Sequence, residues 1–174
     1  MKKKIRALIF ILFLLPYFLS CKNAENESNA KENSDYAKNF SLPSLDGNKT
    51  IEFNDFKDKP RVVNFWASWC APCRQEMPFF EQTWRKFRGK GVVFLGINVL
   101  DQEKNAKEFL NQLGISYINL YDQSGEVAND YGAFALPITF FIDKDGKIVR
   151  KSYGGFIGEE HEKKFVEYVE ELTR

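Results

Sequence analysis

The sequence predicts an α/β domain in which a mixed β-sheet is covered by helices, and three observations carry this prediction. Short β-rich runs alternate with longer segments of helical spacing over most of residues 39–174. Two strand-like runs near the end flank Lys144-Asp145-Gly146, which predicts an antiparallel hairpin beside the other strands. The 174 residues include 17 Phe, 7 Tyr and 3 Trp, enough for the core of one domain.

The folded part is expected to open with a small hairpin followed by a buried strand. Residues 40–45 carry spaced apolar side chains, Asp46-Gly47 signals a turn, and residues 50–53 resume the alternating pattern. Residues 61–67, with the sequence Arg-Val-Val-Asn-Phe-Trp-Ala, form a short apolar and β-rich run. Such a run is typical of a strand that is buried on both faces.

A helix is predicted from Ala71 to Phe87. Pro72 lies in its first turn, where the missing N–H has no helical partner to lose, and Gly89 lies just past its expected end. The remaining elements follow from the same periodicities and turn signals. In chain order they are a strand at 92–99, a helix at 102–113, a strand at 117–120, a short helix at 125–131, strands at 137–143 and 147–153, and an amphipathic helix at 159–172.

Residues 1–20 have the features of a secretory signal peptide. A basic segment precedes an uncharged apolar run, Ala7–Leu19, whose 13 residues are short of the roughly 20 that a membrane span needs. The run ends in Phe18-Leu19-Ser20-Cys21, which resembles the lipobox of bacterial lipoproteins, although Phe18 stands where leucine is usual. The resemblance implies cleavage before Cys21 and a diacylglycerol on its thiol. An ordinary cleaved signal and a retained signal anchor are the alternatives.

Residues 21–38 are expected to form a flexible tether, because they contain mainly Asn, Glu, Lys, Ser and Ala and few apolar side chains. This organisation predicts a domain at 39–174 that is held to a membrane surface outside the cytoplasm by a lipid on Cys21. The 25 Lys and Arg residues are balanced by 24 Asp and Glu residues, so a nucleic-acid partner is not expected.

The cysteine pair Cys70 and Cys73 carries the predicted chemistry. It directly follows a buried strand and opens a helix, where unpaired N–H groups and the positive end of the helix dipole favour a thiolate. Two cysteines at this spacing close a loop too small to stabilise a fold much, which argues against a purely structural disulfide. Inert buried cysteines are one alternative. Zinc is another, but beyond the pair the chain offers only Cys21 and His161, so no metal is expected.

Residues 62–73, Val-Val-Asn-Phe-Trp-Ala-Ser-Trp-Cys-Ala-Pro-Cys, resemble the active-site segment of the TlpA/ResA/CcmG branch of the thioredoxin superfamily. The likeness covers most of residues 40–174 and includes Leu136-Pro137 leading into residues 140–143. It implies a thioredoxin-like mixed β-sheet covered by helices, with an N-terminal β-hairpin and an extra central helix.

The resemblance also implies roles for individual residues. Cys70 corresponds to the exposed nucleophile that attacks a disulfide, and Cys73 to the buried resolving thiol. The proline that matches Pro137 is cis in the family and lies against the cysteine pair, so Leu136 and Pro137 are expected to bind substrate. Trp69 is expected at the exposed rim of the same site, also as a substrate-binding residue.

Glu76 is the third residue predicted to take part in the reaction. Many thioredoxins have a buried Asp six residues before the first cysteine, but this chain has Asn64, which cannot take up a proton. Glu76 lies one helical turn after Cys73 and matches a glutamate that the ResA-like branch uses near its active site. We therefore expect Glu76 to tune Cys73 and to help move its proton. The alternative is an ordinary surface glutamate.

Together these features predict a thiol-disulfide oxidoreductase whose only redox group is the Cys70–Cys73 disulfide. The favoured activity is reduction of disulfides in exported proteins, with electrons from a membrane thiol donor and apocytochrome c as the substrate that the family implies. The absence of a His between the cysteines supports the reductive direction. A disulfide oxidant or isomerase, a thiol peroxidase and a lipid-anchored binding module are the alternatives. Ala135 and Ile138 replace residues common in relatives, which leaves substrate choice open.

Overall fold

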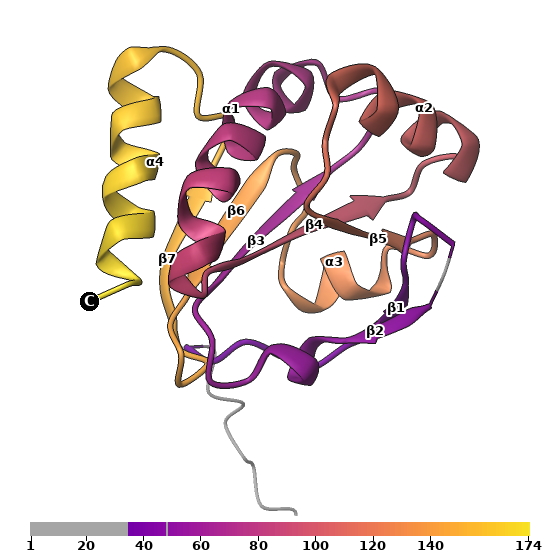
Figure 1. Cartoon of the computed structure of the whole chain (residues 1–174). Coiled ribbons are helices and arrows are strands. Elements are labelled where there is room, and N and C mark those ends of the chain that lie inside the picture. Colours follow the sequence, from indigo (N-terminus) through magenta and orange to yellow (C-terminus); the bar gives the residue numbers. More distant parts are fainter. Residues whose placement is uncertain (1–34, 48) are drawn as a thin grey trace, which may run out of the picture. The chain divides into compact units, whose positions relative to one another are not determined.

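The computed structural model describes residues 35–47 and 49–174 (Figure 1). The predicted signal peptide, Cys21 and most of the predicted tether lie outside these residues. No helix in the described part is both long and apolar enough to cross a membrane.

The elements occur in the predicted order. They are β1 (Ser41–Pro43), β2 (Thr50–Glu52), the 3-10 helix η1 (Phe53–Phe56), β3 (Arg61–Trp66), α1 (Ala71–Phe87), the 3-10 helix η2 (Arg88–Lys90), β4 (Val93–Val99), α2 (Glu103–Leu113), β5 (Ile118–Asp122), α3 (Glu126–Asp130), β6 (Ile138–Ile142), β7 (Ile148–Tyr153) and α4 (Glu159–Glu171).

The central sheet has five strands in the order β5-β4-β3-β6-β7. Strands β3, β4 and β5 run parallel, whereas β6 pairs antiparallel with both β3 and β7. The sheet is therefore mixed, as predicted. Strand β3 lies in the middle and all six of its residues are buried, which agrees with its continuous apolar run. The antiparallel pair β1–β2 forms the predicted hairpin.

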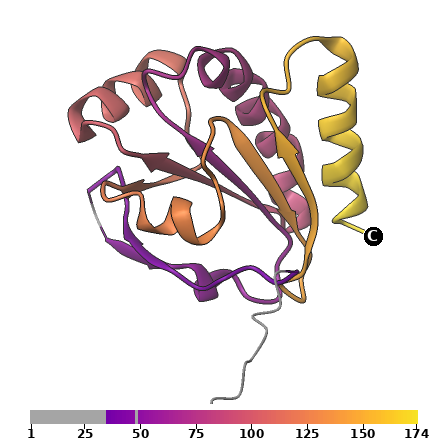
Figure 2. The ribbon, with the colours of Figure 1, turned by 180° about the vertical axis from the view of Figure 1, so that it is seen from behind.

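Successive β3 side chains point to opposite faces of the sheet, and each face has its own core. Val62 and Trp66 pack with apolar residues of α1, α2 and α4. Val63 and Phe65 pack with residues of the β1–β2 hairpin and α3. Figures 1 and 2 show α1 and α4 on one side of the sheet and α3 on the other. This alternation also directs Asn64 toward the face covered by α1.

The end of α1 is followed by a 3-10 turn that the sequence did not predict. The helix begins at Ala71 and ends at Phe87, and Gly89 lies just past that end, as expected. Gly89 lies inside η2, a 3-10 turn that continues the chain past the helix end. The turn ends at Gly91, whose φ of 86° is a conformation that glycine adopts without steric cost.

Ordered contacts begin earlier than the predicted domain boundary at residue 39. The Ala37 N–H donates to the Gly146 carbonyl at 2.9 Å, and the Ile148 N–H donates to the Asp35 carbonyl at 2.7 Å. Tyr36 forms a β-bridge with Lys147. Residues 35–37, which their composition assigned to the tether, thus pair with the turn between β6 and β7 and the start of β7, because backbone groups bond regardless of side-chain polarity.

Candidate active site

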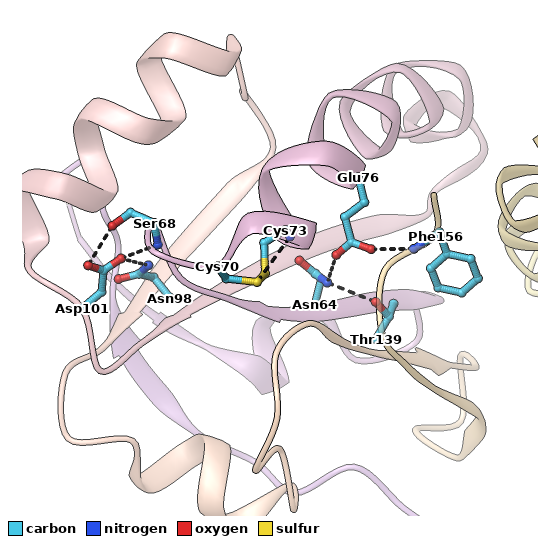
Figure 3. The surroundings of a disulfide bond; sticks show 9 residues. All are labelled: Asn64, Ser68, Cys70, Cys73, Glu76, Asn98, Asp101, Thr139 and Phe156. Atoms are coloured by element: carbon cyan, nitrogen blue, oxygen red, sulfur yellow. Dashed lines mark hydrogen bonds between the residues drawn. A yellow bond between two sulfur atoms is a disulfide. The ribbon is translucent and has the colours of Figure 1, made fainter. Parts of the chain in front are cut away.

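Cys70 and Cys73 form a disulfide at the start of α1, with the sulfur atoms 2.04 Å and the Cα atoms 5.3 Å apart (Figure 3). Cys70 is the N-cap residue, and its Sγ accepts a hydrogen bond from the Cys73 N–H at 3.3 Å. Cys70 keeps 5% of its surface exposed, whereas Cys73 has none. The predicted exposure of Cys70 is therefore limited to a narrow edge, but it is the cysteine of the pair that solvent reaches.

The local sequence explains why the pair sits at a helix start. Strand β3 ends at Trp66, and a short turn leads into Ala71 and Pro72 as the first residues of α1. The first turn of a helix has N–H groups without helical partners, and the helix dipole is positive there. Both effects stabilise a thiolate on Cys70 once the disulfide is reduced.

Glu76 is fully buried one helical turn behind the cysteines. Its Oε1 accepts a hydrogen bond from Asn64 Nδ2 at 3.0 Å, and its Oε2 accepts one from the Phe156 N–H at 2.9 Å (Figure 3). Burial raises the pKa of the Glu76 carboxyl to about 7, and the bonds from Phe156 and Asn64 only partly offset it. The interpretation as an ordinary surface glutamate is thus wrong.

Asn64 connects Glu76 to the sheet. Its Nδ2 also donates to Thr139 Oγ1 at 3.0 Å, so one amide joins residues from β3, α1 and β6. Its Oδ1 is buried and has no partner among the described residues. The position that an aspartate takes in many thioredoxins is here a neutral amide that donates to a buried carboxyl, so Glu76 supplies a titratable group near the pair.

The predicted substrate-binding residues lie in two loops. The Leu136–Pro137 peptide bond is cis, as the family resemblance implies, and Pro137 is buried while Leu136 is half-buried. The Pro137 carbonyl accepts a hydrogen bond from the Gly154 N–H at 2.9 Å. Trp69 is 64% exposed, and its Nε1 donates to the Leu100 carbonyl at 3.4 Å. A substrate-binding role for these three side chains stays a prediction.

The structure adds one residue that the sequence reasoning missed. Asp101 lies two residues past the end of β4, and its carboxylate bonds to Ser68, two residues before Cys70 (Figure 3). The signal was available in the sequence, because β3 and β4 are parallel and the segments after parallel strands meet at the same edge of the sheet. In the described part of the chain, no group of three or more His, Cys, Asp or Glu residues could hold a metal ion.

Comparison with known proteins decides the family. A family model described as AhpC/TSA matches residues 34–151, well over half of the chain. The chain belongs to the AhpC/TSA family. A curated relative, thiol-disulfide oxidoreductase ResA of Bacillus anthracis, is 35% identical over 137 residues, which cover 79% of this chain and 76% of the relative. The thiol:disulfide interchange protein DsbE of Pseudomonas fluorescens is 38% identical over 69% of this chain and 65% of the relative.

A solved structure supports the same assignment. The thiol:disulfide interchange protein of Chlorobium tepidum, a thioredoxin family protein, is 28% identical and superposes with a TM-score of 0.70 over 80% of this chain and 96% of that chain. The fold of this AhpC/TSA family member is therefore thioredoxin-like. With the Cys70–Cys73 disulfide in place, the chain is a thiol-disulfide oxidoreductase of the ResA and DsbE type.

Proposed function

We propose that this oxidoreductase reduces disulfide bonds of exported proteins while tethered to a membrane surface outside the cytoplasm. The observation that carries the proposal is the disulfide at the N-terminus of α1 with a buried, titratable Glu76 one turn behind it. In its dithiol form the pair supplies two electrons, and the Glu76 carboxyl supplies a proton acceptor near neutral pH. Ala71 and Pro72 between the cysteines support the reductive direction, because a His at this place would stabilise the thiolate and favour oxidation.

The first step uses Cys70. In the dithiol form its thiolate attacks one sulfur of the substrate disulfide, the substrate S–S bond breaks, and one substrate sulfur leaves as a thiolate. Cys70 is then joined to the substrate in a mixed disulfide. The edge of Cys70 that solvent reaches is the place where this bond forms.

The second step uses Cys73 and Glu76. The Cys73 thiol loses its proton to the Glu76 carboxylate and attacks Cys70 Sγ, which re-forms the Cys70–Cys73 disulfide and releases the second substrate thiolate. Burial raises the pKa of Glu76 to about 7, close to the optimum for a general base that acts near neutral pH. A membrane dithiol then donates two electrons to the pair and resets the enzyme.

Replacing Glu76→Gln tests this assignment. The amide cannot accept the proton of Cys73, so we expect decay of the mixed disulfide to slow by about 10²-fold, a typical loss for a missing general base. Attack of Cys70 on a small aromatic disulfide is expected to stay nearly unchanged. Rapid-quench trapping of the mixed disulfide measures the two steps separately. Equal resolution rates in the variant and the wild type would remove Glu76 from the mechanism.

The tether is proposed from the sequence. The apolar run Ala7–Leu19 and the lipobox-like segment ending at Cys21 support a lipid anchor on the exported side of a membrane. Cys21→Ala is expected to move the protein from the membrane fraction to the soluble fraction, with the Cys70–Cys73 activity retained. Incorporation of a labelled fatty acid into the wild type but not into the variant completes the test. Unchanged membrane partition would contradict the anchor.

Apocytochrome c is the proposed substrate, supported by the resemblance to the TlpA/ResA/CcmG branch. We expect a peptide with an oxidised Cys-x-x-Cys-His site to be reduced faster than insulin by the same enzyme. A matched peptide whose His is replaced by Ala shows whether the haem-binding motif itself is recognised. Equal rates for the two peptides and insulin would indicate a general disulfide reductase. Turnover of hydroperoxide by Cys70 would instead indicate a thiol peroxidase.

A further inference from the structure

The carboxylate of Asp101 is a point where several hydrogen bonds converge beside the cysteine pair (Figure 3). Its Oδ1 accepts from Ser68 Oγ at 2.9 Å and from the Gln102 N–H at 2.8 Å. Its Oδ2 accepts from the Ser68 N–H at 2.6 Å and from Asn98 Nδ2 at 3.0 Å. The half-buried carboxylate is therefore bonded through both oxygens to two different segments of the chain.

These bonds join the cysteine segment to a well-anchored loop. Ser68 lies between the end of β3 and Cys70, whose own N–H donates to the Ala67 carbonyl at 3.1 Å. On the other side, Tyr121 Oη of β5 donates to the Asp101 carbonyl at 2.8 Å, and the Leu100 N–H donates to the Asp122 carbonyl at 3.2 Å. These two bonds hold the loop after β4 against β5. Because Asp101 in this loop also bonds to Ser68, it holds the residues before Cys70 in place.

A carboxylate fits this place better than an amide of the same shape. Each oxygen of Asp101 faces one backbone N–H, from Ser68 or from Gln102, and a backbone N–H can only donate. An asparagine would turn its own NH2 group toward one of these donors and lose that bond. The charge is also favourable at the N-terminus of α2, which begins at Glu103.

We propose that Asp101 is a positioning residue for Cys70, holding the Ser68–Trp69 segment so that the Cys70 sulfur meets an incoming disulfide in the attacking geometry. The inference rests on the proposed function, since it concerns the rate of that attack. Misplacing a nucleophile by about 1 Å costs up to 10²-fold in rate, so a carboxylate that touches no substrate can control the reaction. The Trp69 indole, bonded to the Leu100 carbonyl, is held by the same loop.

The chain contains a matched control in Glu81 of α1. Its carboxylate accepts from the Ser116 N–H at 2.8 Å and from Ser116 Oγ at 2.6 Å, the same two serine donors that Asp101 binds on Ser68. It also accepts from the Tyr117 N–H at 3.3 Å and from Arg85 Nε at 2.6 Å. Glu81 lies about 12 Å along the helix from Cys73 at 1.5 Å per residue. It therefore fastens a loop in the same way without holding the cysteine segment.

The test compares Asp101→Asn with Glu81→Gln in the full chain. Both are expected to lower the melting temperature, but Asp101→Asn alone is expected to slow alkylation of reduced Cys70 by iodoacetamide and reduction of insulin, roughly tenfold each. It is also expected to shift the Trp69 indole N–H signal in the NMR spectrum. An unchanged Cys70 rate in Asp101→Asn, or an equal loss in Glu81→Gln, would overturn the proposal.

Two further measurements keep the outcomes distinct. If Asp101→Asn does not fold, Ser68→Ala takes its place, because it removes the Oγ bond to Asp101 and keeps the N–H bond. We then expect a two- to threefold loss in the alkylation rate of Cys70. An unchanged rate would overturn the proposal. Alkylation requires no protein substrate. If wild-type protein failed to reduce insulin while its alkylation rate still depended on Asp101, the proposed function would fail and the positioning role would stand.

Discussion

At the scale of single residues, Glu76 shows what the sequence predicts of the active site and what it does not. Its spacing from Cys73 places it on the cysteine side of α1, which periodicity alone predicts. Its burial and its bond to Asn64 depend on which face of β3 meets α1. That relation is set by tertiary packing, so the sequence could propose the partner of Cys73 but could not distinguish a surface glutamate from a buried one. Asp101 was missed because its partner Ser68 is remote in the chain, although the parallel arrangement of β3 and β4 predicts that the segments after both strands lie at the same edge of the sheet.

The raised pKa of Glu76 predicts a pH-dependent stability. Because burial raises the pKa of the Glu76 carboxyl from its ordinary value of 4.5 to about 7 on folding, the folded state binds the proton more tightly than the unfolded state. The stabilisation is complete below about pH 4.5 and is lost as the pH rises through about 7, by roughly 3 kcal/mol in total. Urea unfolding of the oxidised protein from pH 4 to pH 8 measures this loss.

Glu76→Gln and Glu81→Gln provide the comparison for that experiment. Glu76→Gln is expected to remove the loss, giving a flatter dependence of unfolding free energy on pH than in the wild type. At Glu81, hydrogen bonds from Ser116, Arg85 and Tyr117 outweigh the effect of burial and lower the pKa of the carboxyl. The stabilisation that the Glu81 carboxylate contributes is therefore lost as the pH falls, whereas that of Glu76 is lost as the pH rises. A Glu76→Gln profile that parallels the wild type would show that Glu76 does not titrate in this range.

At the scale of elements, the order and approximate bounds of the helices and strands follow from local patterns. The α1 helix begins and ends at the predicted residues because Pro72 and the preceding strand leave little choice at its start. Gly89 lies just past the end of α1 as predicted, but the 3-10 turn η2 that follows was not predicted, because such a turn has no clear sequence marker. The packing of α4 on α1 could not be predicted from the sequence, because an amphipathic pattern identifies the buried face of a helix but not the element that covers this face.

Phe165 holds α4 against the active-site helix. It has no exposed surface, and its ring stacks on Phe80 of α1 with centroids 4.1 Å apart. Its ring also meets that of Phe156 at 5.0 Å, the residue whose N–H binds Glu76. Phe165→Ala is expected to lower the free energy of unfolding by about 3–5 kcal/mol, because it leaves a large cavity.

Phe134→Ala is the matched control for this packing. The Phe134 ring is 82% exposed, so the same truncation is expected to change the free energy of unfolding by less than about 0.5 kcal/mol. Denaturant titrations of both variants against the wild type give the two values. A small effect of Phe165→Ala would mean that α4 does not contribute to the core around α1.

At the scale of the whole molecule, composition predicted that the folded domain starts at residue 39, whereas ordered backbone contacts begin at residue 35. Polar residues 35–38 resemble a linker, yet their backbone pairs with Gly146 and Ile148, and the Lys38 carbonyl accepts from Tyr131 Oη at 2.6 Å. A chain that starts at Asn39 is therefore expected to be about 1–2 kcal/mol less stable than one that starts at Asn33, given the net value of lost hydrogen bonds. Equal urea midpoints for the two chains would contradict these contacts.

The reduction potential of the Cys70–Cys73 couple determines whether the pair donates electrons to a substrate disulfide, as proposed, or accepts them from substrate thiols. The measurement uses the mature chain without its lipid, equilibrated in dithiothreitol or glutathione buffers, with Trp69 fluorescence reporting the redox state. We expect a potential near or below about −250 mV, on the side of the scale where thioredoxin acts as a reductant. A potential near about −120 mV would identify an oxidant and would contradict the proposed reductase.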